Sequence, residues 1–273
     1  MARALNRRPG RAGLILLGAL PFIVLVAVYL VASDARLAVN PADKLLPSPE
    51  SLAAAIDRLA FQPDPRRGTY ILWSDTLASL LRLFLGLAIA TGIGLAAGIA
   101  IGLLPLVRAA FAPLVAALSM VPPLAILPIL FIVLGLGELS KVVLIVIGIA
   151  PFLVRDLSMA VGSLPREQLV KAQTLGASTW QIVTRVVLPQ TLPRLISALR
   201  LSLGPAWLFL ISSEAIASTE GLGYRIFLVR RYLAMDVILP YVIWITLLAF
   251  LLDYLLRLFA RRAFGWLPGE QQP

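Results

Sequence analysis

Long apolar stretches recur along this sequence and constrain its fold more than any other feature. A helix needs about 20 mostly apolar residues to cross the hydrocarbon core of a bilayer. The chain has 273 residues, of which 60% are hydrophobic and only 14% are charged, whereas a soluble domain has roughly 25% charged residues. A soluble core of this size could not cover so much apolar surface. The sequence therefore predicts an all-α membrane protein with about six transmembrane helices.

The expected spans divide the chain into tails, loops and a helical core. A basic tail at 1–12 precedes the first span at 13–32. A signal peptide starts in a similar way, but this apolar run is long for one, and no small-x-small cleavage site precedes Ser33. We therefore expect an uncleaved first helix. The remaining segments are a periplasmic stretch (33–82), a core (83–259) with a hydrophilic loop (162–194), and a cytoplasmic tail (260–273); the core spans are expected near 83–104, 109–134, 142–161, 195–217 and 237–259.

The distribution of charge predicts the orientation of these spans. Cytoplasmic loops of membrane proteins collect lysine and arginine. If the amino terminus is cytoplasmic, the inner segments hold 14 cations and three acids, a balance of +11, and the outer segments hold nine of each. Both termini are therefore expected in the cytoplasm, which fits an even number of spans. The formal net charge of +10 is thus a topology signal, and we expect no nucleic-acid partner.

The composition also argues against enzymes. The sequence contains no cysteine and no histidine, which removes the thiolate nucleophile, the commonest general base and the commonest metal ligand. No G-x-x-x-x-G-K-[ST] phosphate loop is present either. We therefore expect no catalytic residue, no metal, no cofactor and no ATP site within this chain.

Glycines and prolines mark two of the spans. Gly94, Gly98 and Gly102 are spaced four residues apart, so they share one helix face and favour close helix packing within the chain; a subunit interface or a pore lining is the alternative. Pro122 and Pro123 fall near the middle of the third span. Each proline removes a backbone donor, which predicts either a kink or a break that faces the solute path.

The loop at 162–194 is too polar to span a membrane, and its pattern predicts two short helices. The first begins near Pro165 and ends at Gly176, because glycine accepts the backbone conformation that stops a helix. Ser178 and Gln181 form an S-x-x-Q capping box for the second helix, which is expected to stop before Pro189. This helix–turn–helix leaves apolar residues exposed and therefore needs a partner surface.

Within this loop the sequence resembles the EAA loop of binding-protein-dependent ABC importer permeases. That pattern reads E-A-A, three residues, G, nine residues, I-x-L-P. Ala172, Gly176, Leu188 and Pro189 match it in register, and a valine at 186 replaces the isoleucine. Val170 and Lys171 stand where Glu and Ala are usual, which puts a role for a loop carboxylate in doubt. Further resemblance to the nitrate/sulfonate/taurine/bicarbonate branch lies at 46–49, 79–82, 121–125, 135–141 and 221–224.

The resemblance implies the permease subunit of a type I ABC importer, with MetI-like architecture, in the bacterial inner membrane. Such permeases work in pairs, here expected as a homodimer in membrane lipid. They couple to a separate cytoplasmic ATPase and receive solute from a periplasmic or lipid-anchored binding protein. The expected cargo is a small solute of the nitrate, sulfonate or taurine type. The residues expected to contact the ATPase are Val170, Lys171, Ala172, Gly176, Ala177, Trp180, Leu188 and Pro189.

Two alternatives remain open at this stage. The same machinery could carry a urea-like or guanidine-like solute, because the segment 221–253 has a loose similarity to permeases that accompany enzymes carboxylating such compounds. A passive channel or a secondary transporter is the other class, although the cytoplasmic helix–turn–helix argues against it. ATP-dependent uptake distinguishes the second class from an importer.

Charged residues inside the spans are candidates for function. Pro122, Pro123, Ser212, Ser213 and Glu214 are the candidate translocation-path residues. Glu214 could line the path, but we favour a hydrogen bond between it and the loop at 221–223, in which case a Gln substitution should be tolerated. Asp253 and Arg257 are expected to pair across one helical turn, Arg82 to snorkel to the outer interface, and Trp207, Trp244 and Trp266 to serve in packing.

Overall fold

The computed structural model describes residues 10–65 and 68–265, and within these residues it is entirely helical. Five helices are long and apolar enough to cross a membrane, or six if a bent pair counts as one span. This agrees with the expected number of spans. The helices are α1 (Arg11–Val39), α2 (Pro49–Ala60), α3 (Ile71–Leu103), α4 (Pro105–Leu118), α5 (Pro123–Leu134), α6 (Glu138–Gly162), α7 (Arg166–Thr174), α8 (Thr179–Ile182), α9 (Leu188–Ile216), α10 (Leu222–Arg230) and α11 (Met235–Ala263), with a π-helical segment at Val183–Val187.

The core of the bundle is the contact of α3 with α6, and glycines allow it. A Cβ atom added at Gly94 would lie 2.6 Å from Leu153 Cβ, and one at Gly98 would lie 2.7 Å from Leu157 Cβ. Gly102 meets Val161 in the same way. The glycine face therefore packs within the chain, as the sequence predicted.

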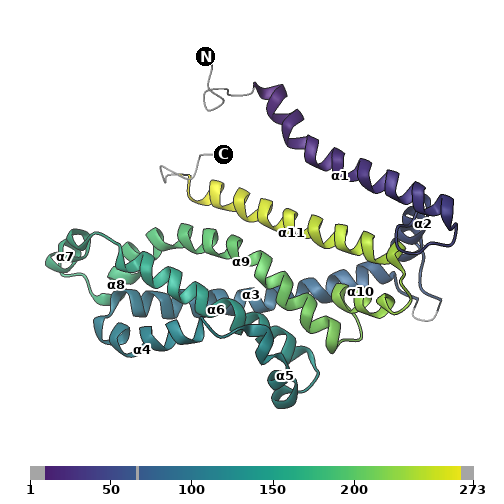
Figure 1. Ribbon diagram of the computed structural model, residues 1–273. Coiled ribbons are helices and arrows are strands. Elements are labelled where there is room, and N and C mark those ends of the chain that lie inside the picture. Colours follow the sequence, from purple (N-terminus) through teal and green to yellow (C-terminus); the bar gives the residue numbers. More distant parts are fainter. Residues whose placement is uncertain (1–9, 66–67, 266–273) are drawn as a thin grey trace.

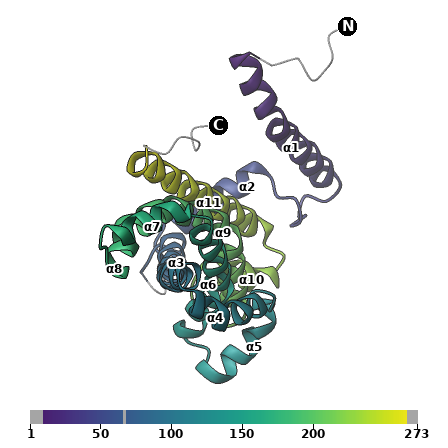
Figure 2. The ribbon, with the colours of Figure 1, turned by 90° about the vertical axis from the view of Figure 1, so that its left-hand side faces the viewer.

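The helix α1 stands apart from this bundle (Figures 1 and 2). None of its 18-residue apolar window is buried within the chain. Near its carboxyl end, Tyr29 Oη donates a hydrogen bond of 2.6 Å to Pro47 O and Ser33 Oγ donates one of 3.0 Å to Leu46 O. The apolar side chains of α1 thus need cover from lipid or from a neighbouring subunit.

The expected third span at 109–134 is broken into two helices. The axes of α4 and α5 differ by 94°, which confirms the prediction of a kink or break at Pro122 and Pro123. Pro122 is the residue before α5 and Pro123 is its first residue, a position where a missing backbone donor costs little. Pro113 and Pro128 lie inside α4 and α5 without ending them. The adjacent pair of prolines therefore breaks the span, and the single ones do not.

The elements sort to the two ends of the long helices (Figure 1). The short helices α7 and α8 lie at the left end of the view, and α2 and α10 lie at the right end. The helix α3 starts 12 residues earlier than the expected second span and takes in part of the segment that the sequence assigned to the periplasm. This extension brings Asp75, Ser79 and Arg82 into the helical bundle.

Candidate functional site

The loop between α6 and α9 forms the expected helix–turn–helix. Gly176 follows α7 with a φ angle of 78°, a conformation that glycine adopts without strain. The Ser178–Gln181 capping box is present: the backbone N–H of Gln181 donates to Ser178 Oγ (3.3 Å) and the backbone N–H of Ser178 donates to Gln181 Oε1 (2.8 Å). Both features confirm the turn that the sequence predicted.

The loop residues singled out from the sequence divide into an exposed and a packed group. Trp180 is 73% exposed, Val170 and Lys171 are also exposed, and the neighbouring Leu175, which is outside that set, is 79% exposed. Large apolar residues that are exposed in this way indicate an interaction surface. The packed group is Ala172, Ala177 and Leu188, which contact a small core formed by Ile99, Val161, Ile182 and Val187. Gly176 is exposed and Pro189 is half-buried.

The second short helix does not stop before Pro189, which corrects the sequence prediction. It passes through the π-helical segment into α9, so that residues 179–216 form one continuous helical stretch. A proline clashes with the carbonyl four residues before it, and the wider π turn relieves this clash. Gln190 Nε2 donates to Val186 O (2.9 Å) and Thr191 Oγ1 donates to Val187 O (3.0 Å), so nearby carbonyls keep partners.

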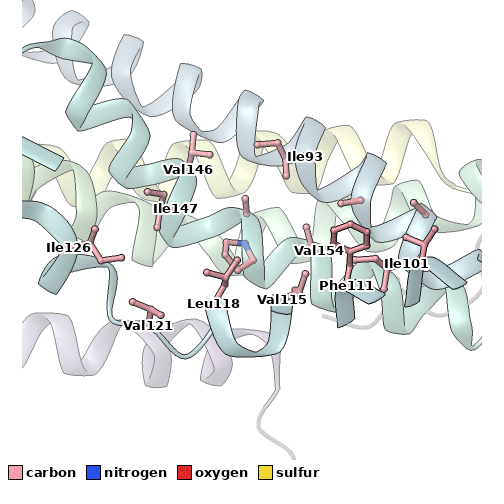
Figure 3. Close-up of a pocket in the computed structure, with 15 residues that line it drawn as sticks. Ile93, Ile101, Phe111, Val115, Leu118, Val121, Ile126, Val146, Ile147 and Val154 are labelled. Atoms are coloured by element: carbon pink, nitrogen blue, oxygen red, sulfur yellow. The ribbon is translucent and has the colours of Figure 1, made fainter. Parts of the chain in front are cut away.

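An apolar cavity of about 600 Å³ lies beside the broken span. Figure 3 shows side chains from α3, α4, α5 and α6 around it, with Val121 of the break among them. Pro122, Pro123, Ser212, Ser213 and Glu214 do not line it. The structure therefore does not bring the candidate path residues together: the prolines lie at the α4–α5 break, and the other three lie near the end of α9. Ser213 is buried and donates to Leu210 O (2.8 Å), whereas Ser212 is half-buried.

Glu214 is fully buried and accepts hydrogen bonds from three directions. Ser79 Oγ lies 2.8 Å from Oε1, Arg82 Nη1 lies 2.7 Å from Oε1, and the backbone N–H of Gly223 donates to Oε2 at 2.9 Å. The bond to Gly223 is the one that the sequence predicted. The ion pair with Arg82 adds a contact that depends on the charge of Glu214, so we expect a Gln substitution to lower stability.

Arg82 does not snorkel to the interface, which corrects a second prediction. Its side chain is only 4% exposed and lies between two carboxylates. The Nη1 atom pairs with Glu214, while Nε and Nη2 form a two-pronged contact with Glu138. A guanidinium can be buried when carboxylates of this geometry satisfy its donors.

A second buried carboxylate, Asp75, was missed by the sequence analysis. It accepts hydrogen bonds from Arg225 Nε (2.8 Å), Tyr241 Oη (3.0 Å) and the backbone N–H of Gly221 (3.0 Å). These donors come from α10, α11 and the loop before α10, so Asp75 ties α3 to that end of the bundle. The spacing of Asp75, Ser79 and Arg82 at i, i+4 and i+7 places them on one helix face and could have revealed this polar stripe.

Ion pairs also join the helices toward the opposite end of the bundle. Asp156 of α6 pairs with Arg194 of α9. The expected Asp253–Arg257 pair is present at 3.3 Å, but Arg200 of α9 is the nearer partner of Asp253 at 2.8 Å.

Trp207 is buried and Trp244 packs against the core, whereas Trp266 lies outside the described residues. Among the residues that the structure describes, no group of three or more His, Cys, Asp or Glu side chains could hold a metal.

The fold and these sites define a multi-pass membrane protein with a helix–turn–helix at one end of a helical core. Residues 88–265 match the family described as "Binding-protein-dependent transport system inner membrane component", and the chain belongs to this family. It is therefore a permease subunit of a bacterial ABC transporter, located in the membrane.

Similar proteins agree with this assignment. The chain is 37% identical over 201 residues to the taurine transport system permease protein TauC of Escherichia coli, with 74% of this chain and 73% of that protein covered. It is 30% identical over 226 residues to the putative aliphatic sulfonates transport permease protein SsuC of Escherichia coli, with 83% of each covered. A structure of the MetNI methionine ABC transporter aligns with a TM-score of 0.61 at 22% identity, covering 70% of this chain and 95% of that chain. This likeness shows a shared MetI-type fold.

Proposed function

We propose that the chain forms the translocation path of an importer for small sulfonates such as taurine, driven by a separate cytoplasmic ATPase. The proposal that a separate ATPase binds this chain rests on the exposed apolar surface of the α7–α8 loop. Leu175 and Trp180 are more than two-thirds exposed, although the loop that carries them is ordered by a glycine turn and a capping box. An ordered apolar surface of this kind is explained by a protein partner.

The cargo class rests on the similar permeases, whose names specify taurine and aliphatic sulfonates. A binding protein on the outer face would deliver the sulfonate, and the ATPase would bind at the α7–α8 end. We infer that both termini are cytoplasmic, because in that orientation the inner segments carry the excess of lysine and arginine.

A second copy of the chain is the proposed partner within the membrane. The helix α4 has no buried residue within this chain, and with α5 it borders the apolar cavity of about 600 Å³ (Figure 3). In this proposal α4 packs against the second copy, and the solute path lies between the two copies.

The test is ATP-driven uptake in proteoliposomes that contain the chain, its ATPase and its binding protein. We expect taurine to accumulate only when hydrolysable ATP is present on the ATPase side. Uptake of a urea-like or guanidine-like solute in place of taurine would overturn the cargo. Equal uptake with and without ATP would overturn the importer and favour a passive channel or a secondary transporter.

A further inference from the structure

We propose that Arg82 and Lys141 form an anion site for the sulfonate group of the cargo, and that the carboxylate of Glu138 occupies this site in the present conformation. The inference rests on the proposed function, because it names the place where that cargo binds. Glu138 is then a competing internal anion that the cargo displaces. None of these three residues belongs to the coupling loop or to the candidate path residues named from the sequence.

The two cations are buried while their shared partner is not. The side chains of Arg82 and Lys141 are 4% and 3% exposed, whereas that of Glu138 is 62% exposed. Glu138 can therefore turn into solvent by rotating its own side chain, and the two cations stay in place. It is the first residue of α6 and follows the α5–α6 turn, which contains Gly137 and Gly135, the latter with a φ angle of 78°. This places the site at the turn between α5 and α6.

The donor geometry matches an oxyanion. Arg82 turns its Nε and Nη2 edge toward Glu138, with Nη2 2.9 Å from Oε1, while Lys141 Nζ lies 2.7 Å from the same Oε1. This edge of a guanidinium binds two oxygens of one planar or tetrahedral acid group. Two of the three oxygens of a sulfonate can replace both carboxylate oxygens, and the third remains free to accept another donor.

The charge balance selects a monoanion. Arg82 and Lys141 contribute two positive charges, and the fully buried Glu214 compensates one of them through Arg82 Nη1 at 2.7 Å. Lys141 Nζ also lies 3.2 Å from Ser218 Oγ, which is neutral. When Glu138 turns away, one positive charge remains in a buried site. A sulfonate restores neutrality, whereas urea or another neutral solute does not.

The test compares Glu138→Gln with the wild-type chain in the assembled transporter in nanodiscs, without binding protein and with methanesulfonate as the probe. If Glu138 leaves its site in about a tenth of the molecules, removing it should tighten methanesulfonate binding about tenfold. In a medium that holds only bulky anions, the variant should also unfold at a lower temperature than the wild type. Adding methanesulfonate should restore that temperature, because the probe supplies the missing negative charge.

Two variants act as controls. Asp236→Asn removes a carboxylate from an ion pair of 3.9 Å with Arg58 and should bind the probe as the wild type does. The double variant Glu138→Gln with Lys141→Gln, checked for folding by its elution as a single species, should lose the gain in affinity. Unchanged or weaker binding by Glu138→Gln, or stabilisation by methanesulfonate equal to that by any salt, would overturn the anion site.

The outcomes separate this inference from the proposed function. If taurine uptake occurs and Glu138→Gln shows no gain in methanesulfonate binding, the anion site is wrong and the proposed cargo stands. If the variant binds methanesulfonate more tightly and taurine is not transported, the anion site is supported. The transported solute is then an acid other than taurine.

Discussion

Arg82 of α3 and Glu214 of α9, separated by 132 positions in the sequence, form an ion pair of 2.7 Å inside the helical bundle. Around this pair, Ser79 donates to Glu214 and Glu138 accepts from Arg82. The loop before α10 joins the same network, because Arg82 Nη1 also donates to Glu220 O at 2.9 Å. The network therefore links α3 to the first residue of α6 and to the last turn of α9.

Glu214→Ala should destabilise the protein strongly, because it leaves the buried Arg82 with only one carboxylate. Breaking a buried ion pair from one side costs about 3–5 kcal/mol. Glu214→Gln should also lower stability, since its amide nitrogen cannot accept the hydrogen bonds that the carboxylate receives. The measurement is thermal unfolding in detergent. Asp34→Asn at an exposed position of α1 is the control and should change stability by at most about 0.5 kcal/mol. A Gln variant as stable as wild type would contradict this account of the ion pair.

Gly98→Ala should loosen the contact between α3 and α6. The added Cβ would lie 2.7 Å from Leu157 Cβ and 3.3 Å from the backbone oxygen of Val154. Overpacking of this kind costs about 1–3 kcal/mol, and thermal unfolding measures it. Gly92→Ala on the same helix has open space around the new Cβ, so it should be neutral or stabilising. Equal effects of the two substitutions would show that helix propensity, rather than packing, sets the outcome.

A periplasm-active reporter fused after Pro273 should give no signal, because the distribution of lysine and arginine predicts a cytoplasmic carboxyl terminus. The same reporter inserted after Gly68, between α2 and α3, should give a strong signal. Western blots must show equal amounts of both fusions. The reverse pattern would overturn the orientation and with it the assignment of the α7–α8 loop to the ATPase side.

The sequence predicted well those features that depend on neighbouring residues. Apolar runs located the spans, Gly176 located the turn between α7 and α8, and Ser178 with Gln181 predicted a capping box that is present. Each of these features depends on residues a few positions apart, so both partners of the contact lie within one short sequence pattern. The glycine face of α3 was predicted for the same reason, although its partner helix α6 was not named.

The sequence could not predict contacts between distant segments. An arginine just before an apolar run, such as Arg82, is typical of an interface residue. No neighbouring residue in the sequence shows that Glu138 and Glu214 surround it. The extent of α3 was underestimated because Asp75 and Arg82 lower the local hydropathy, although both are buried by partners. Pro189 was taken as a helix stop because the π turn that accommodates it leaves no recognisable sequence pattern.

The most direct test of the central claim, that the α7–α8 loop couples this permease to a separate ATPase, is the substitution Gly176→Trp. Gly176 has a positive φ angle of 78° and open space around it, so the change strains the turn by about 1–2 kcal/mol without a clash inside the chain. Gly68→Trp is a matched control, because Gly68 also has a positive φ angle of 65° and open surroundings but lies between α2 and α3.

The measurement is copurification of the ATPase together with ATP-driven taurine uptake, for both variants and the wild type, at equal amounts of folded permease. We predict that Gly176→Trp loses both the bound ATPase and the uptake, and that Gly68→Trp retains both. Wild-type copurification and uptake in Gly176→Trp would contradict the claim that this loop is the coupling point.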